Sequence, residues 1–350
     1  MILRFRFLIF IFSVSFLSSC FKNDDPIILT PPGDVQTDQV AMGPDYYNQI
    51  YYKLSTKESS TSDHRCWDLA FETTLSGFHI WLNSGNQIFA ANTNSSNFSS
   101  VYDTTGANWK WDASSWNKDS TAIGDWINLS PNDPVSTIDV PFTSTPGREE
   151  EKEGATAVYL LDLGPDLNSY ERFKKIVFKT VNHFQYTFKY ANLDNSDYHE
   201  ITLDKEPGFA YSYFSIRNGN TVVHPEPIKP NWDILFTRYS TILYSNGSMI
   251  HYPVNGVLIN PEGYSVAIDS SKAFSDIDFD FAKDLNYKSN RDVIGYNWKH
   301  YSFSSSSYEV SENINYIIKD KSGYYWKLHF IGFYNDQGIK GYPQFEYQRL

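Results

Sequence analysis

The feature that most constrains the fold of this chain is a set of four short blocks that occur in one order and then occur again. Each block is a run of four to six mainly aromatic or aliphatic residues. The pairs are 51–54 (YYKL) with 213–216 (YFSI), 67–71 (WDLAF) with 232–236 (WDILF), 158–162 (VYLLD) with 315–319 (NYIIK), and 173–178 (FKKIVF) with 325–330 (YWKLHF). Because the order of blocks repeats, rather than a short fixed period, the pattern argues against a solenoid. It predicts two related β domains, residues 46–200 and 201–350.

Composition and local patterns favour strands over helices. The chain contains 26 Tyr, 25 Phe and 9 Trp, which are residue types enriched in strands. Residues 184–190 alternate aromatic and polar side chains, as a half-buried strand does because successive side chains face opposite ways. An apolar run over 324–334, a turn at 335–338 and a second run at 345–348 indicate an antiparallel pair. We therefore expect an all-β fold made of sandwich-like antiparallel domains.

Three local segments carry their own expectations. Short helices are predicted near 169–175 and 275–283, where helical periodicity is weak. The charged run 147–154 is interpreted as a solvated loop, because consecutive like charges favour solvent. The repeated Trp-Asp-x-x-Phe motif is interpreted as structural, since its large rings bury area and its Asp can accept hydrogen bonds from a neighbouring turn.

The start of the chain indicates where the protein is located. A short basic region precedes an apolar stretch, residues 7–17, that is too short to span a bilayer. Leu17-Ser18-Ser19-Cys20 resembles the lipobox of bacterial lipoproteins. The resemblance implies that residues 1–19 are a signal peptide and that the Cys20 sulfur is diacylated. The chain would then be cleaved before Cys20, and the new amino group of Cys20 would be acylated. Two or more acyl chains form a stable membrane anchor where one does not.

The segment that follows Cys20 is predicted to be a lipidated tether, residues 20–45. It contains several prolines and a glycine among polar residues, which is typical of a linker. Asp24 and Asp25 resemble the export tag that sends lipoproteins of Bacteroidetes to the cell surface. We expect a protein that is lipid-anchored at the outer membrane, on the cell surface.

Charge and cysteine content exclude several classes of function. The formal net charge is −12 at pH 7 and no basic run is present, so we expect no nucleic-acid partner and no electrostatic binding to anionic membranes. Membrane attachment is therefore expected through lipid only. Of the two cysteines, Cys20 is used by the anchor, so Cys66 has no disulfide partner and is interpreted as an inert, buried thiol.

The second half of the chain resembles a known family. Its motifs are Trp-Asp-Ile-Leu-Phe at 232–236, Asn-Gly at 246–247, Gly-Tyr-Tyr-Trp-Lys-Leu at 323–328 and Lys-Gly-Tyr-Pro-Gln-Phe-Glu-Tyr at 340–347. Together they resemble the HmuY-type haem-binding lipoproteins of Bacteroidetes, whereas the first half carries only part of the pattern. The resemblance implies all-β domains, a lipid anchor, capture of haem, and transfer of haem to a TonB-dependent receptor of the outer membrane. The chain is longer than single-domain members because of its first half.

A haem iron needs axial ligands, usually His, Met, Cys or Tyr, in apolar surroundings. Of the eight histidines, His251 and His300 lie near predicted turns in the half that carries the complete pattern. We therefore take His251, His300 and Met249 as candidate haem ligands, either as a bis-His pair or as a His–Met pair. Ordinary strand or surface histidines remain the alternative for each, and the flanking Tyr and Trp residues are equally compatible with a platform for sugars.

Signatures of enzymes are absent from the sequence. It has no Gly-x-Ser-x-Gly elbow, no phosphate-binding glycine loop, no dinucleotide fingerprint and no His-Glu-x-x-His zinc motif. We expect a binding protein rather than an enzyme. Haem binding is the leading hypothesis, and the alternative is a surface glycan-binding or structural lipoprotein without haem activity.

Overall fold

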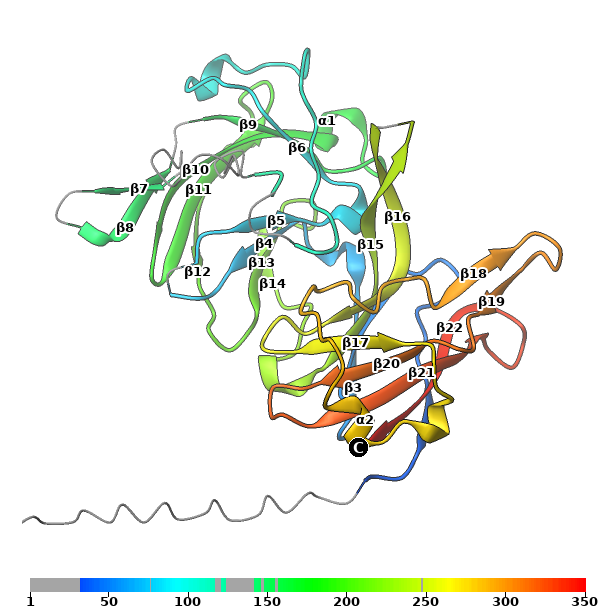
Figure 1. The fold of residues 1–350 in the computed structure, drawn as a ribbon. Helices are drawn as coiled ribbons and strands as arrows, with labels where there is room; N and C mark the ends of the chain where they lie inside the picture. Colours follow the sequence, from blue (N-terminus) through cyan, green and yellow to red (C-terminus); the bar gives the residue numbers. More distant parts are fainter. Residues whose placement is uncertain are drawn as a thin grey trace, which may run out of the picture. The chain divides into compact units, whose positions relative to one another are not determined.

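The structure is a computed structural model. It describes residues 32–75, 77–116, 121–123, 142–145, 148–154, 157–246 and 248–350 (Figure 1). The strands within 142–154, and residues 248 and 249, are described by their backbone alone. The predicted signal peptide 1–19, the lipidation site Cys20 and the first part of the tether lie outside the described residues.

Antiparallel strands are the dominant regular structure of the described residues, so the all-β prediction is confirmed. Helices among the described residues are single turns: α1 (Ser169–Arg172), α2 (Phe279–Ala282), η1 (His64–Cys66), η2 (Ser84–Asn86), η3 (Phe98–Ser100), η6 (Lys229–Asn231) and η7 (Phe274–Asp276). The Asn168 side chain caps α1 by accepting hydrogen bonds from the backbone N–H groups of Tyr170 and Glu171. Phe173 follows with extended backbone, so the helix ends after one turn.

Two sheets pack around one hydrophobic core, and we call these two sheets the second sheet pair. One sheet has the order β1-β22-β21-β20-β17 and the other β16-β15-β2-β3. The strands are β1 (Gln36–Gln39), β2 (Asn48–Tyr52), β3 (Ser59–Asp63), β15 (Ile234–Ser245), β16 (Ser248–Ile259), β17 (Ser265–Asp269), β20 (Asn315–Lys319), β21 (Tyr325–Tyr334) and β22 (Lys340–Arg349). Alternate side chains of these strands meet in one core, which includes Ile50, Phe236, Val257, Leu328 and Phe345.

Two further sheets form the first sheet pair. One has the order β14-β13-β4-β5, and the other has the order β12-β11-β10-β8-β7, with β9 joining β10 to β6. The strands are β4 (Leu69–Glu72), β5 (Ile80–Leu82), β6 (Phe89–Asn92), β7 (Phe142–Thr145), β8 (Arg148–Gly154), β9 (Tyr159–Asp162), β10 (Phe173–Asn182), β11 (Gln185–Asn192), β12 (His199–Asp204), β13 (Tyr211–Ser215) and β14 (Thr221–Val223). Their shared core includes Leu69, Phe71, Ile176, Phe188 and Phe214.

One local expectation is corrected. The charged run 147–154 was expected to be a loop, but Arg148–Gly154 is strand β8. It pairs with β7 on one side and with β10 on the other, for example Glu153 opposite Thr180. Backbone pairing on both edges outweighs the preference of these charged residues for a loop.

Strand pairing crosses the boundary that was expected between residues 200 and 201. Strand β2 pairs with β15, placing Tyr52 opposite Ile234. Strand β13 pairs with β4, placing Phe214 opposite Leu69. Each hydrophobic core therefore takes residues from both of the predicted ranges, 46–200 and 201–350.

The repeated blocks make matching contacts in the two sheet pairs. Phe71 stacks on Phe188 with ring centroids 5.3 Å apart, and Phe236 stacks on Phe345 at 5.4 Å. Strand β9 pairs with β10 just as β20 pairs with β21. These matches support a proposal that the chain holds two related units, with one strand of each paired to the other unit.

A pair of buried lysines extends the match. Lys175 donates to the carbonyl oxygens of Val101 (2.9 Å) and Leu193 (3.1 Å). Lys327 occupies the corresponding block position and donates to the carbonyl oxygens of Phe274 (2.8 Å) and Ile277 (2.9 Å). Burying an ammonium group is costly unless its donors are satisfied, so each lysine fixes the loops that supply those carbonyls.

Candidate functional site

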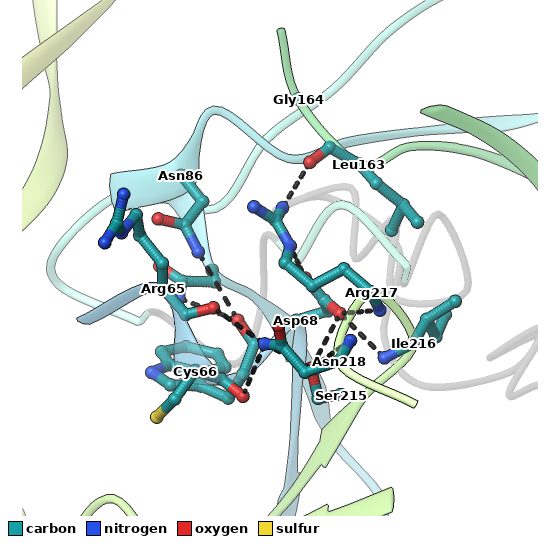
Figure 2. A network of polar contacts seen from close by, with 12 residues as sticks. Arg65, Cys66, Asp68, Asn86, Leu163, Gly164, Ser215, Ile216, Arg217 and Asn218 are labelled. Carbon is teal, nitrogen blue, oxygen red and sulfur yellow. Dashed lines mark hydrogen bonds and ion pairs between the residues drawn. The ribbon is translucent and has the colours of Figure 1, made fainter. Parts of the chain in front are cut away.

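The first Trp-Asp motif, at 67–68, links two strands through hydrogen bonds to its aspartate. The buried Asp68 carboxylate accepts hydrogen bonds from the backbone N–H groups of Ile216 (2.7 Å) and Arg217 (2.9 Å), and from Arg217 Nε at 2.6 Å (Figure 2). The Arg217 guanidinium also donates to the carbonyl oxygen of Leu163 (Figure 2). The motif therefore fixes the end of β13 against β4.

The second Trp-Asp motif, at 232–233, makes equivalent hydrogen bonds in the second sheet pair. The Asp233 carboxylate accepts the backbone N–H of Leu54 at 2.7 Å, Lys53 Nζ at 2.5 Å and the Tyr264 hydroxyl at 2.6 Å. Trp67 and Trp232 are both buried. These contacts agree with the structural interpretation of the motif.

A long hairpin, β15–β16, carries two of the predicted ligands. Each of its strands has 12 residues, whereas β4 and β5 have 4 and 3. Asn246 lies at the tip with a φ of 51°, a left-handed conformation that Asn tolerates better than most residues. Toward this tip the hairpin exposes apolar side chains, namely Leu243, Tyr244, Ile250 and Tyr252.

His251 is held in place by contacts on several sides. Its Nε2 lies 2.5 Å from Ser240 Oγ, and its ring packs against Phe89 and Trp111 at centroid distances of 5.0 and 5.5 Å. The Ser240 hydroxyl donates its single proton to the carbonyl oxygen of Ser84 at 2.8 Å, so it must accept from His251. This assigns the proton to Nε2 and leaves the lone pair on Nδ1. Burial lowers the pKa of His251, which favours the neutral form.

Met249 follows the same tip. Its backbone pairs with Tyr244 across the hairpin, which places it two residues from His251 on β16. Its side chain lies outside the described residues.

A second hairpin carries His300. It consists of β18 (Lys299–Ser302) and β19 (Ser307–Val310), drawn in orange in Figure 1. The His300 side chain is 61% exposed, and its Nε2 lies 3.6 Å from Glu309 Oε2. Phe303 at the tip is 90% exposed, and Tyr301 beside it is also exposed. His300 therefore has a free approach and apolar neighbours.

The two hairpins are connected at their bases. Lys299 Nζ donates to the carbonyl oxygen of Asn255 on β16 at 2.6 Å, and burial lowers the pKa of Lys299 to about 7. Tyr308 packs on Tyr301 with centroids 5.3 Å apart. Burial raises the pKa of Tyr308, and nearby Tyr252 on β16 raises it further. Sequence reasoning missed Lys299 and these tyrosines, because nothing local indicates that β16 and the β18–β19 hairpin are neighbours.

The structure places His251 and His300 on different hairpins. Among the described residues, the hydrogen bonds and ring contacts of one share no partner with those of the other. His251 is packed toward the first sheet pair, and His300 faces solvent. A bis-His pair would therefore require His251 to act through Nδ1 or to leave Ser240.

Two other histidines pair with carboxylates. His79 pairs with Glu72 at 2.6 Å, and His329 pairs with Glu346 at 3.0 Å while stacking on Phe274. Within the described part of the chain, no cluster of three or more His, Cys, Asp or Glu side chains is arranged to hold a metal ion. Cys66 is partly buried and burial raises its pKa to about 11, so the thiol stays protonated.

Two cavities do not suit a porphyrin. One lies between the sheet pairs and offers about 30 Å³ to the centres of water-sized particles, which is far too little for a porphyrin. The other, of about 340 Å³, is open and polar, and it is lined by Asp63, Arg65, Cys66, Asp166, Arg217 and Asn218. A haem site needs apolar walls, so the apolar surface of the two hairpins is the better candidate.

No helix among the described residues is long and apolar enough to cross a bilayer.

The fold and the two hairpins define an all-β protein whose second sheet pair presents apolar side chains around a histidine. Residues 210–347 match the sequence model of the HmuY protein family. This match confirms the resemblance of the second half to the HmuY family. The match begins beside β13 and ends within β22, so it contains both hairpins.

Several solved structures are similar to this chain at low identity. Apo PinO from Porphyromonas gingivitis is 10% identical, covering 91% of this chain and 97% of its own, with a TM-score of 0.28. The apo HmuY analogue of Tannerella forsythia is 9% identical, covering 91% and 98%, with a TM-score of 0.20. An HmuY-like heme-binding protein from Bacteroides vulgatus is 16% identical, covering 50% and 90%, with a TM-score of 0.17. At these values the likenesses carry no conclusion about the site. No curated protein matches the chain.

Proposed function

We propose that this protein binds haem on the second sheet pair, on the apolar surface formed by the β15–β16 and β18–β19 hairpins. The observation that carries the proposal is His300, which is exposed near the base of the β18–β19 hairpin, beside the exposed rings of Tyr301 and Phe303. That hairpin lies within the segment that matches the HmuY family. The fold and family favour a binding protein and not an enzyme.

The residues present fit a haem group. Haem needs a neutral imidazole with a free approach and apolar surface for the porphyrin faces. His300 supplies the imidazole, and the exposed side chains of Tyr252, Tyr301 and Phe303 supply apolar surface on both hairpins. The bound group would supply the iron that His300 ligates.

A second axial ligand would come from the β15–β16 hairpin. Met249 and His251 are the candidates, and the two differ in accessibility. His251 is neutral but engaged with Ser240 and packed between aromatic rings, so it is the more constrained of the two described imidazoles. His300 is therefore proposed as the principal ligand.

Titration of the purified protein with haemin tests this proposal. We expect a sharp Soret band at micromolar haemin that is lost or strongly shifted in His300→Ala. His224→Ala is a matched control, because His224 is also exposed and lies 3.4 Å from a carboxylate, that of Glu206. An unchanged Soret band in His300→Ala, or none with the unmodified protein, would contradict the proposal. In the second case glycan-array binding would test the alternative, since the exposed rings also suit sugars.

We also propose that the protein is a lipoprotein anchored through Cys20 at the outer membrane, and that it passes haem to a TonB-dependent receptor. The lipobox-like sequence before Cys20 and the family of the second half support this. Palmitate labelling of cells should mark the protein and leave Cys20→Ala unlabelled. Loss of haem from the protein to vesicles that contain the receptor would test the transfer, and equal loss to empty vesicles would argue against it.

A further inference from the structure

The small cavity between the two sheet pairs has an unusual lining. Two arginines, Arg238 and Arg291, line it together with polar groups such as Gln49, Asn83 and Thr237, and no carboxylate does so. The remaining walls are mainly aromatic and aliphatic side chains from both sheet pairs. A concave site with two cations and no anion attracts negative charge, because the low dielectric of its walls focuses the field.

Arg291 is the more deeply buried of the two arginines. It is 6% exposed, and its Nε–H has no hydrogen-bond partner among the described residues. Its guanidinium lies over the ring of Trp116 at 3.8 Å, and Trp116 stacks on Trp81 with centroids 5.1 Å apart. This aromatic stack fixes the guanidinium at the cavity wall but does not neutralise its charge.

No nearby carboxylate neutralises Arg291 directly. Within the described part of the chain, neither Arg238 nor Arg291 forms an ion pair, whereas Arg65, Arg172 and Arg217 each do. The charge of Arg291 acts on the buried Glu226, whose oxygens already accept from the backbone N–H groups of Ala210 and Tyr211 and from the Tyr213 hydroxyl. Burial raises the pKa of Glu226 to about 7, so at neutral pH its carboxylate is only partly ionised.

A buried cation without a counter-charge is costly, and a missing acceptor adds to the cost. We propose that the cavity binds a small monovalent anion of the halide class, chloride under ordinary salt conditions, with Arg291 as its principal ligand and Arg238 contributing charge. The cavity offers about 30 Å³ to the centres of water-sized particles, which is enough space for a single chloride ion.

The anion would act as a bridge between the sheet pairs. The cavity walls come from β2 and β15 on one side and from β5, β13 and Trp116 on the other. An ion that binds only when both walls are assembled stabilises the folded state, and the gain in free energy rises with the logarithm of the ion concentration once that exceeds the dissociation constant. This site is independent of the proposed haem site and does not rely on it.

Bromide provides the direct test, because it substitutes for chloride and scatters anomalously. Crystals of the unmodified protein grown in sodium bromide should show an anomalous peak in the cavity beside the Arg291 guanidinium. A water molecule there without anomalous signal would overturn the proposal.

Thermal unfolding provides a second test in solution. At constant ionic strength, we expect the midpoint to rise as chloride replaces gluconate, with the rise lost in Arg291→Gln and retained in Arg172→Gln, whose arginine pairs with Asp162 elsewhere. An equal midpoint in chloride and gluconate for the unmodified protein would overturn the proposal. If Arg291→Gln does not fold, Arg238→Gln serves instead and should weaken the response to chloride.

Discussion

The Asp233 carboxylate accepts the backbone N–H of Leu54 at 2.7 Å across 179 residues of sequence. In the first sheet pair, the equivalent hydrogen bond runs from the backbone N–H of Ile216 to the Asp68 carboxylate at 2.7 Å. In the repeated blocks, Leu54 corresponds to Ile216 and Asp68 to Asp233. Each aspartate therefore fixes a strand that comes from the other half of the chain.

The first prediction concerns these two aspartates. Replacing Asp68 or Asp233 by Ala should lower the free energy of unfolding by about 3–5 kcal/mol, because buried cations and N–H donors would lose their acceptor. Urea unfolding at pH 7 measures this change. Asp280→Ala is the control, since Asp280 pairs with Lys283 on the surface and should cost at most about 1 kcal/mol. A loss of less than 1 kcal/mol at both buried sites would contradict a structural role.

The second prediction tests the exchange of strands. Thr237 Oγ1 lies 3.4 Å from Gln49 Oε1 across β2 and β15. In a Cys66→Ser background, Gln49→Cys with Thr237→Cys should form a disulfide, because facing side chains on paired strands are close enough to be bridged. After cleavage at a protease site inserted at the exposed residues 207–208, the two fragments should stay joined on a non-reducing gel.

The matched control for that experiment combines Gln49→Cys with Lys319→Cys. Lys319 ends β20, which pairs with β17 and β21 rather than with β2. This pair should leave the fragments separate. Separate fragments for the protein with Gln49→Cys and Thr237→Cys would contradict the pairing of β2 with β15.

The third prediction concerns the base of the β18–β19 hairpin. Burial lowers the pKa of Lys299 from 10.5 to about 7. Between these values the unfolded chain binds more protons than the folded one, so the free energy of unfolding should rise as the pH increases from 7 to 10. In Lys299→Met this rise should diminish and stability at pH 6 should increase, despite loss of the bond to Asn255. Lys319→Met, at an exposed position of β20, should keep the slope; an unchanged slope in Lys299→Met would mean that Lys299 titrates normally.

The fourth prediction separates binding from stability. Phe303 is almost fully exposed, so Phe303→Ser should leave the urea midpoint unchanged. If haem covers this ring, the substitution should weaken haemin binding about tenfold or more, since burying a Phe side chain contributes about 1.5–3 kcal/mol. Tyr102→Ser, at an exposed position of the first sheet pair, should bind haemin normally. Equal affinity in Phe303→Ser and the unmodified protein would exclude the hairpin tip from the site.

Sequence alone supports the all-β fold and the resemblance of the second half, because alternation and aromatic content are local properties. The strand β11 follows directly from the alternating residues 184–190, and β21 with β22 from two apolar runs around a turn. The strand β8 was missed, since its charged residues carry no such signal, and its strand conformation follows from backbone pairing with β7 and β10.

Long-range pairing could not be predicted in the same way. Nothing near Tyr52 or Phe214 indicates that each pairs with a strand from the other half, because equivalent blocks have similar sequences and either partner satisfies the pattern. The same limit applies to the site. His251 and His300 were chosen for their nearness to turns, but their different surroundings depend on contacts with Ser240, Phe89 and Glu309 that are distant in the sequence or follow from strand register.

The most direct test of the account is a crystal structure of the protein grown with haemin, with the iron located by its anomalous scattering. We predict one strong iron peak within coordination distance of His300, between the hairpins β15–β16 and β18–β19. An iron peak on the first sheet pair, or haemin bound without contact to either hairpin, would contradict it.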